Sequence, residues 1–175
     1  MGPLRTGEPR RAGSLRRSRG LRRLSRRGLR RQEPVVVIAA QSYADGDAEG
    51  VALVLAAPLS FWGGVDVESG RIIDHSHPDL GQVITGRILV MPGGRGSSSA
   101  SSVFAESIRR GSGPAGIILA IADPILTVGA LVAHSLYGLR CPVVVCSIDR
   151  LITDRHVRIR TTEDGRAEVF SEDGN

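Results

Sequence analysis

The sequence predicts one α/β domain in which a few helices pack on a mixed β-sheet. The chain has 175 residues, of which 41% are hydrophobic, and this is enough to form one sizeable core. The first half contains mainly strand-like segments, whereas the second half alternates strand, helix, strand, helix and strand before a closing hairpin. This alternation is typical of helices that pack on a sheet.

Apolar runs bounded by turn residues define the expected strands of the first half. Pro34 opens the first run, and segments rich in Gly, Asp and Pro separate the others. We predict strands at residues 35–40, 50–62, 71–74 and 82–91, with connecting segments at 41–50, 63–66 and 75–81.

The second half shows a helical period after Ser98, where four residues share one face and Gly111 supplies a stop. A second helix is expected from Pro124 to Tyr137, because proline is favoured in the first turn of a helix. The shared face of the first helix comprises Val103, Phe104, Ser107 and Ile108. Further strands are expected at 115–122 and 141–146, and a hairpin at 156–170 with Asp164 and Gly165 in its turn.

All 23 basic residues are arginine, and the sequence contains no lysine. A Walker-type phosphate loop and a Schiff-base lysine are therefore excluded. The long apolar run at 115–133 is interrupted by Asp123 and Pro124, so we predict no membrane-spanning segment. We expect a soluble, cytoplasmic protein.

The arginines are concentrated at the N-terminus. Residues 1–31 contain 12 arginines and one acidic residue, whereas residues 32–175 carry a net charge of −6. The basic segment could bind nucleic acid or an anionic membrane or serve as a transit peptide, but its composition favours a disordered extension. We expect a disordered arm at 1–33, a folded domain at 34–170 and a tail at 171–175, with neither nucleic acid nor membrane as partner.

Two cysteines, Cys141 and Cys146, lie five residues apart in an expected strand. Side chains at this spacing point to opposite faces, so the two thiols cannot form a disulfide with each other or share a metal. We expect both to be reduced core residues.

Residues 91–111, MPGGRGSSSASSVFAESIRRG, place a loop rich in glycine and serine between a strand and a helix. Backbone N–H groups converge at such a helix N-terminus and favour anions. The glycines permit close approach of a ligand, and Arg95 could bind a carboxylate or phosphate. The alternative is an ordinary helix with a serine cap, for which Ser98 is the expected N-cap.

The segment SFWGGVD, residues 60–66, contains the single tryptophan of the chain. Trp62 could pack over a ligand or a partner, but a buried core position at a tight turn is the more common arrangement. Asp66 is expected to cap that turn.

The segment DHSHPD, residues 74–79, contains two histidines flanked by acidic residues. His75 and His77 would share one face of a strand, which is compatible with a metal. No third ligand with suitable spacing is present, so we predict no metal site.

Four segments of the chain occur together in an order that is specific to one family. They are residues 60–81, 87–111, 113–133 and 141–145. Together they resemble the small subunit of the aconitase X family, and the resemblance runs from Glu49 to Val145. That family includes phosphomevalonate dehydratase of archaea and cis-3-hydroxy-L-proline dehydratase of bacteria.

The resemblance implies a swivelling β/α domain of aconitase type that acts as one subunit of a hydro-lyase. A large subunit would carry the cysteines that hold an iron–sulfur cluster or iron, and this chain alone would bind no cofactor. The implied partners are that large subunit and a hydroxy acid, either cis-3-hydroxy-L-proline or 5-phosphomevalonate. The alternative is a non-catalytic anion-binding or regulatory domain that retains the loop.

The resemblance also implies that Ser97 is the general base that removes the α-proton of the substrate. Donors of the loop would stabilise its alkoxide, and the metal of the large subunit would act as Lewis acid on the departing hydroxyl group. No metal ligand is assigned to this chain. We assign substrate binding to Arg95, Gly96, Ser98, Gly63, Gly64 and Asp66.

The sequence departs from the family pattern at three places. Val67 stands where proline is usual, Ala100 stands where glycine is often found, and the arginine-rich arm has no counterpart. None of these departures touches Arg95, Gly96 or Ser97, so they leave the substrate more open than the activity.

Overall fold

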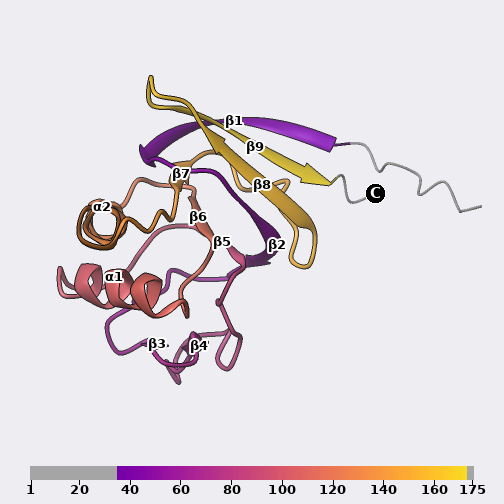
Figure 1. Cartoon of the computed structure of the whole chain (residues 1–175). Helices are drawn as coiled ribbons and strands as arrows, with labels where there is room; N and C mark the ends of the chain where they lie inside the picture. The colour runs from indigo at the N-terminus through magenta and orange to yellow at the C-terminus, as the bar shows by residue number, and fades with distance from the viewer. Residues whose placement is uncertain (1–34, 173–175) are drawn as a thin grey trace, which may run out of the picture. The chain divides into compact units, whose positions relative to one another are not determined.

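A computed structural model describes residues 35–172 of the chain (Figure 1). The basic arm expected at 1–33 lies outside the described residues, as do residues 173–175 of the expected tail. The final strand continues to Glu172, so the sheet includes the first two residues of that tail. Neither helix in the described part of the chain is long and apolar enough to cross a membrane.

Seven of the strands that the structure describes form a closed sheet (Figure 1). In order around the sheet they are β1 (Val35–Ala44), β7 (Val143–Val145), β6 (Gly116–Leu119), β5 (Ile88–Met91), β2 (Ala48–Val54), β8 (His156–Thr161) and β9 (Arg166–Glu172). β9 pairs again with β1 and closes the sheet. The short strands β3 (Val65–Asp66) and β4 (Arg71–Ile72) form a separate two-stranded sheet.

The closed sheet is mixed, as the sequence predicts. β2, β5, β6 and β7 are parallel neighbours, whereas β1, β8 and β9 complete the sheet through antiparallel pairs. The alternation of strands and helices indicated the parallel part, but it did not indicate closure. Closure depends on the pairing of β1 with β9, which joins the two ends of the described domain, and local patterns do not specify such a pair.

The parallel strands are buried on both faces, and each face belongs to a different hydrophobic cluster. Ile88 and Val90 of β5 and Ile118 of β6 belong to the cluster inside the closed sheet. Leu89 and Met91 of β5 belong to the cluster between the sheet and the helices. Strands covered on both sides have continuous apolar sequences, which explains the segments ILVM and GIIL.

Two helices, α1 (Ala100–Arg110) and α2 (Pro124–Tyr137), lie side by side against the parallel strands (Figure 1). Each helix ends at a glycine in the left-handed conformation, Gly111 with φ 74° and Gly138 with φ 68°. The bounds predicted for the second helix and the stop predicted at Gly111 are confirmed. A Cβ atom at Gly129 of α2 would lie 2.7 Å from the Ser101 carbonyl oxygen, so this glycine allows the two helices to approach closely.

Several expected strand boundaries in the first half are wrong. β1 continues to Ala44 and β2 begins at Ala48, so most of the loop expected at 41–50 is strand. Both extensions pair with distant strands, and these ladder bonds override the local polar composition. Conversely, most of 55–62 and 82–87 consists of bends, turns and isolated bridges, because these segments wrap over the ends of the strands.

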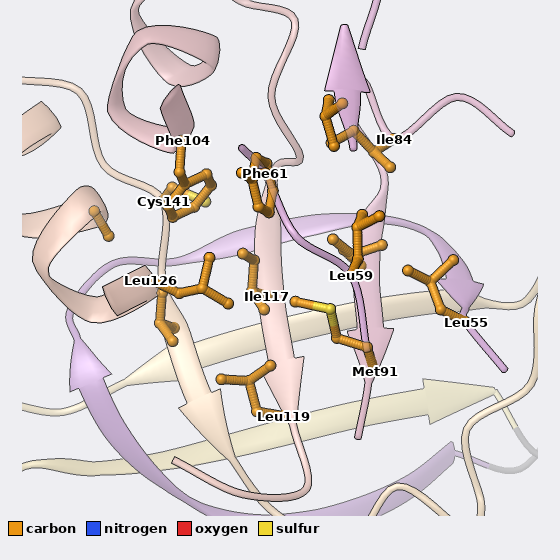
Figure 2. Packing of buried hydrophobic residues seen from close by; sticks show 14 of the residues in the cluster. Leu55, Leu59, Phe61, Ile84, Met91, Phe104, Ile117, Leu119, Leu126 and Cys141 are labelled. Carbon is orange, nitrogen blue, oxygen red and sulfur yellow. The ribbon is translucent and has the colours of Figure 1, made fainter. Parts of the chain in front are cut away.

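The two neighbouring aromatic residues after Ser60 have opposite environments. Phe61 is buried, and its ring packs on Phe104 of α1 with centroids 4.7 Å apart and planes inclined at 51° (Figure 2). Trp62 is 61% exposed, so the prediction of a buried tryptophan is wrong. At this turn only one of the two aromatic side chains enters the core, and it is Phe61, which packs beside Phe104.

We expect Phe61→Ala to lower the free energy of unfolding by about 3–5 kcal/mol, because it leaves a cavity beside Phe104. Trp62→Ala is the matched control, since it removes a larger side chain that is mostly in solvent, and its cost should stay below about 1 kcal/mol. Urea unfolding followed by circular dichroism measures both. Equal losses for the two variants would contradict the burial pattern described above.

Candidate functional site

Loops leave the carboxyl ends of the parallel strands β2, β5, β6 and β7 at one edge of the sheet. They cover residues 55–64, 92–99, 120–123 and 146–155. The Arg95 N–H donates to the Leu59 carbonyl at 3.2 Å, and the Ile121 N–H donates to the Pro92 carbonyl at 3.1 Å, so three of these loops are joined. In both open and closed α/β sheets, ligands commonly bind at the carboxyl ends of the parallel strands.

The serine loop, residues 92–99, packs closely on its neighbours because two of its positions are glycine. A Cβ atom at Gly94 would lie 2.1 Å from Oδ2 of Asp123. Gly96 has a φ of +112°, and a Cβ atom there would lie 2.6 Å from Oγ of Ser60. Side chains at these two positions would push the loop away from the neighbouring segments.

The serine loop ends at the N-terminus of α1, where backbone donors are left without acceptors. Among the residues that the structure describes, none accepts a hydrogen bond from the N–H groups of residues 96–99, and the Ser97 hydroxyl has no partner. All four of these residues are exposed. Unpaired donors beside the positive end of a helix favour an anion, as the sequence pattern predicts.

The prediction that Ser98 is the N-cap of α1 is wrong. The N-cap is Ser99, which has φ −61° and ψ −20° and forms no side-chain cap hydrogen bond, because this helical backbone does not direct its hydroxyl toward the free N–H groups. Ser98 contributes its carbonyl, which accepts from the N–H of Ser101 at 3.1 Å and from its hydroxyl at 2.7 Å.

Arg95 extends from the serine loop to Asp74, which follows β4. Its Nη2 donates to Oδ2 of Asp74, while 53% of the arginine side chain remains exposed. The Ser76 hydroxyl and N–H donate to the other oxygen of Asp74 at 2.6 and 2.8 Å. These hydrogen bonds from Ser76, together with the charge of Arg95, lower the pKa of Asp74, so the carboxylate is ionised at neutral pH.

Two of the remaining predicted substrate-binding residues lie beside the serine loop. Gly63 and Gly64 follow Trp62, and a Cβ atom at Gly64 would lie 2.2 Å from the Ser60 carbonyl oxygen. A Cβ atom at Gly96 would also meet Ser60, so the turn at 60–64 packs against the serine loop, with Gly63 exposed and Gly64 buried.

Asp66 lies at the other end of α1. It accepts from the Ser69 hydroxyl at 2.5 Å and the Glu68 N–H at 3.2 Å, and these two hydrogen bonds lower its pKa. Asp66 therefore caps the turn that follows it, residues 66–69, and not the turn at Gly63 and Gly64 that the sequence predicts. Glu68 of the same turn pairs with Arg110 in the last turn of α1. Ser97 precedes the first turn of this 11-residue helix, so the length of the helix, about 16 Å, separates the turn of Asp66 from Ser97.

His75 and His77 do not share a strand face, and that prediction is wrong because residues 74–81 form turns. His75 is exposed, whereas His77 is buried and its Nε2 donates to the Ala57 carbonyl at 3.2 Å. The Asp79 N–H donates to Nδ1 of His77 at 3.1 Å. The described part of the chain contains no group of three or more His, Cys, Asp and Glu that could hold a metal ion.

Cys141 and Cys146 flank β7 and lie on opposite faces of the sheet, as the sequence predicts. Cys141 belongs to the cluster under the helices, and Cys146 packs against the cluster inside the closed sheet. Desolvation raises the pKa of Cys141 to about 12 and that of Cys146 to about 11. Both thiols therefore stay protonated at neutral pH, which disfavours the thiolate form that binds metals.

Asp123 is a neighbour of the serine loop that the sequence pattern revealed only as an interruption of an apolar run. Its Oδ1 accepts from the N–H groups of Ile125 and Leu126 at 2.8 and 3.0 Å and so caps α2, while Oδ2 faces Gly94. An aspartate directly before a proline that opens a helix is a typical N-cap signal.

The fold and the site together define an α/β domain that presents a serine-rich loop with unpaired backbone N–H groups at the carboxyl edge of its parallel strands. A family model described as the aconitase X swivel domain matches residues 37–169. The chain belongs to the aconitase X swivel domain family, as its motifs imply.

Solved and curated relatives agree with this assignment. The crystal structure of Thermococcus kodakaraensis aconitase X in its holo-form has a TM-score of 0.68 and 32% identity, covering 77% of this chain and 98% of that chain. The phosphomevalonate dehydratase small subunit of Pyrococcus horikoshii is 40% identical over 125 residues, which are 71% of this chain and 88% of that protein.

The cis-3-hydroxy-L-proline dehydratase of Hypocrea jecorina is 39% identical over 121 residues, which are 67% of this chain and 20% of that protein. The chain thus spans about a fifth of the length of the first curated relatives that it matches. The rest of those relatives lies outside the matched region.

We expect Asp123→Ala to lower the free energy of unfolding by about 0.5–2 kcal/mol, because it removes the side-chain cap of α2. Ser98→Ala tests the start of the other helix and should change that energy by less than about 0.5 kcal/mol, since the Ser98 hydroxyl has no partner among the described residues. Urea unfolding of the two variants provides the comparison. A loss for Ser98→Ala as large as that for Asp123→Ala would show that Ser98 does cap α1.

Proposed function

We propose that the chain is the small subunit of an aconitase X-type hydro-lyase that dehydrates a hydroxy acid together with a large subunit. The observation that carries the proposal is the position of Ser97 among unpaired N–H groups, beside Arg95 and at the N-terminus of α1. The relatives support the reaction class, because those named above are dehydratases or aconitase X.

The compounds in the relatives' names, cis-3-hydroxy-L-proline and phosphomevalonate, share a carboxylate, a proton on the adjacent α-carbon and a hydroxyl group on the next carbon. Dehydration removes that proton and the hydroxyl group as water. Arg95 would bind the carboxylate through guanidinium N–H groups that Asp74 does not use. The carboxylate would then hold the α-carbon near the serine loop.

Ser97 acts in this proposal as the general base that takes the α-proton onto Oγ. The neutral hydroxyl is too weak a base for this step, so Oγ must first lose its own proton to solvent, and the resulting alkoxide and the developing enolate need stabilisation. The free N–H groups of residues 96–99 and the helix dipole would supply it. We assign loss of the hydroxyl group to the large subunit, where iron or an iron–sulfur cluster is expected, because the described residues of this chain include no suitable ligand set.

The two substrates differ in the cationic contacts that they need. cis-3-Hydroxy-L-proline presents one carboxylate, which Arg95 alone can pair. A phosphomevalonate also presents a phosphate, for which the large subunit would have to supply a second cationic group. We therefore propose the class of hydroxy acid, and an assay with both compounds distinguishes its two members.

The second candidate function is a non-catalytic domain that binds an anion at the serine loop. The same free donors and the same arginine support it, since neither anion binding nor helix-dipole stabilisation needs a base. It differs from the first candidate in one measurable respect, because replacing Ser97 would then leave turnover by the complex unchanged.

We expect Ser97→Ala to reduce turnover by roughly a hundredfold or more in the complex with the large subunit, because a positioned base is lost. The assay measures dehydration of cis-3-hydroxy-L-proline and 5-phosphomevalonate by the purified two-subunit complex. Folding should be unaffected, since the Ser97 hydroxyl has no hydrogen-bond partner in the described structure.

Ser98→Ala and Ser99→Ala are the matched controls, because they remove the same atom from the next two positions of the loop. Both should lose much less turnover than Ser97→Ala, because Ser98 is assigned to substrate binding and neither hydroxyl takes the α-proton in this proposal. If one of them abolishes turnover while Ser97→Ala does not, the base lies one or two residues further along. Normal turnover by all three would support the anion-binding alternative.

A further inference from the structure

The segment DHSHPD has no role in the proposed chemistry, yet its first residue contacts the serine loop. Asp74 divides its two oxygens between two partners. Oδ1 accepts from the N–H and the hydroxyl of Ser76, and Oδ2 accepts from Nη2 of Arg95. The carboxylate side chain is 18% exposed, so it is sheltered while the guanidinium that it holds remains half exposed.

The rest of the segment fixes Asp74 to the loop that precedes Ser60. His77 is buried and donates from Nε2 to the Ala57 carbonyl at 3.2 Å. Oδ2 of Asp79 accepts from the Ala56 N–H at 2.9 Å, and the His77 N–H donates to the Asp74 carbonyl at 3.0 Å. The turn that carries Asp74 is therefore anchored at several points, which defines where its carboxylate can lie.

Arg95 keeps most of its donors free in this arrangement. A guanidinium has five N–H donors, and in the described structure the side chain uses only Nη2, for Asp74. One edge of the group is thus held by a fixed carboxylate, while the remaining N–H groups are left for an incoming anion. A long side chain that is already oriented loses less conformational freedom when it binds a ligand.

We propose that Asp74 is a positioning residue, which holds the guanidinium of Arg95 in the orientation that binds the substrate carboxylate. The proposal rests on the proposed function of the serine loop and adds a residue from a different segment to it. It also gives DHSHPD a role: His77 and Asp79 anchor the turn, Ser76 orients Asp74, and Asp74 orients Arg95.

The first test measures the orientation of Arg95 in the chain alone. In NMR spectra of isotope-labelled protein, the Nη protons of an arginine give separate signals when a partner restrains rotation about the Nε–Cζ bond. We expect restrained signals for Arg95 in the wild type and averaged signals in Asp74→Asn, which keeps an acceptor for Ser76 but loses the charge. Averaged signals in the wild type would overturn the proposal.

Asp154→Asn is the matched control for this test. Asp154 forms an ion pair with Nη2 of Arg87 at 2.5 Å, and the same Nη2 also donates to the Ala52 carbonyl at 2.7 Å. Asp154→Asn removes one partner of Arg87, whose Nη2 keeps its hydrogen bond to the Ala52 carbonyl, and it should leave the signals of Arg95 unchanged. A change in Arg95 that is equal in both variants would indicate a general loss of structure and would contradict a specific role for Asp74.

The second test uses steady-state kinetics of the two-subunit complex on cis-3-hydroxy-L-proline and 5-phosphomevalonate. A positioning role predicts that Asp74→Asn raises KM by roughly tenfold or more with a smaller change in kcat. It also predicts that Arg95→Ala with Asp74→Asn is no worse than Arg95→Ala alone, because Asp74 acts through Arg95. Fully additive losses would overturn the proposal.

A lower KM in Asp74→Asn would also overturn it, because Asp74 would then compete with the substrate for Arg95. Failure of the proposed function gives a different result: the wild-type complex would be inactive on both compounds although Arg95 is restrained by Asp74. The kinetic and NMR tests therefore separate the two proposals.

Discussion

The site depends on the burial of the parallel strands on both faces. β5 and β6 carry apolar side chains into the closed sheet on one face and under the helices on the other, so their register is fixed from both sides. Because these strands are parallel, the loop after β5 and the loop after β6 must emerge at the same edge. The contact of Gly94 with Asp123 is a direct consequence, since it joins these two loops.

Close packing of two glycines positions the backbone N–H groups that produce the local electrostatic field at this edge. Gly94 and Gly96 bring the loop backbone against Asp123 and Ser60, which leaves the N–H groups of residues 96–99 exposed. The net charge of residues 32–175 is −6, yet salt screens interactions between exposed charges over about 8 Å at physiological ionic strength. Groups close to the loop therefore decide the attraction of an anion here, where Arg95 and the helix N-terminus favour it and the carboxylates of Asp74 and Asp123 oppose it.

The sequence predicts the local elements of this structure well and its long-range contacts poorly. The bounds of α2 and the end of α1 at Gly111 follow from capping residues and helical periodicity, which are local signals. The extension of β1, the exposure of Trp62 and the pairing of Arg95 with Asp74 depend on segments that are distant in the chain. The sequence located the serine loop but misplaced its helix cap, because three consecutive serines offer the same hydroxyl at each position and backbone angles alone decide among them.

The exposure of the serine loop explains why this chemistry would require a second subunit. In water, hydration competes with the N–H groups of residues 96–99 for an alkoxide on Ser97, so the isolated loop stabilises that anion only weakly. Covering the loop with another protein surface lowers the local dielectric constant and strengthens the same hydrogen bonds without moving them. The Arg95 side chain gains in the same way, because Asp74 already restricts its position before the water is excluded. In the proposed complex, the domain would supply prearranged donors and a base, and the covering subunit would determine how strongly they act.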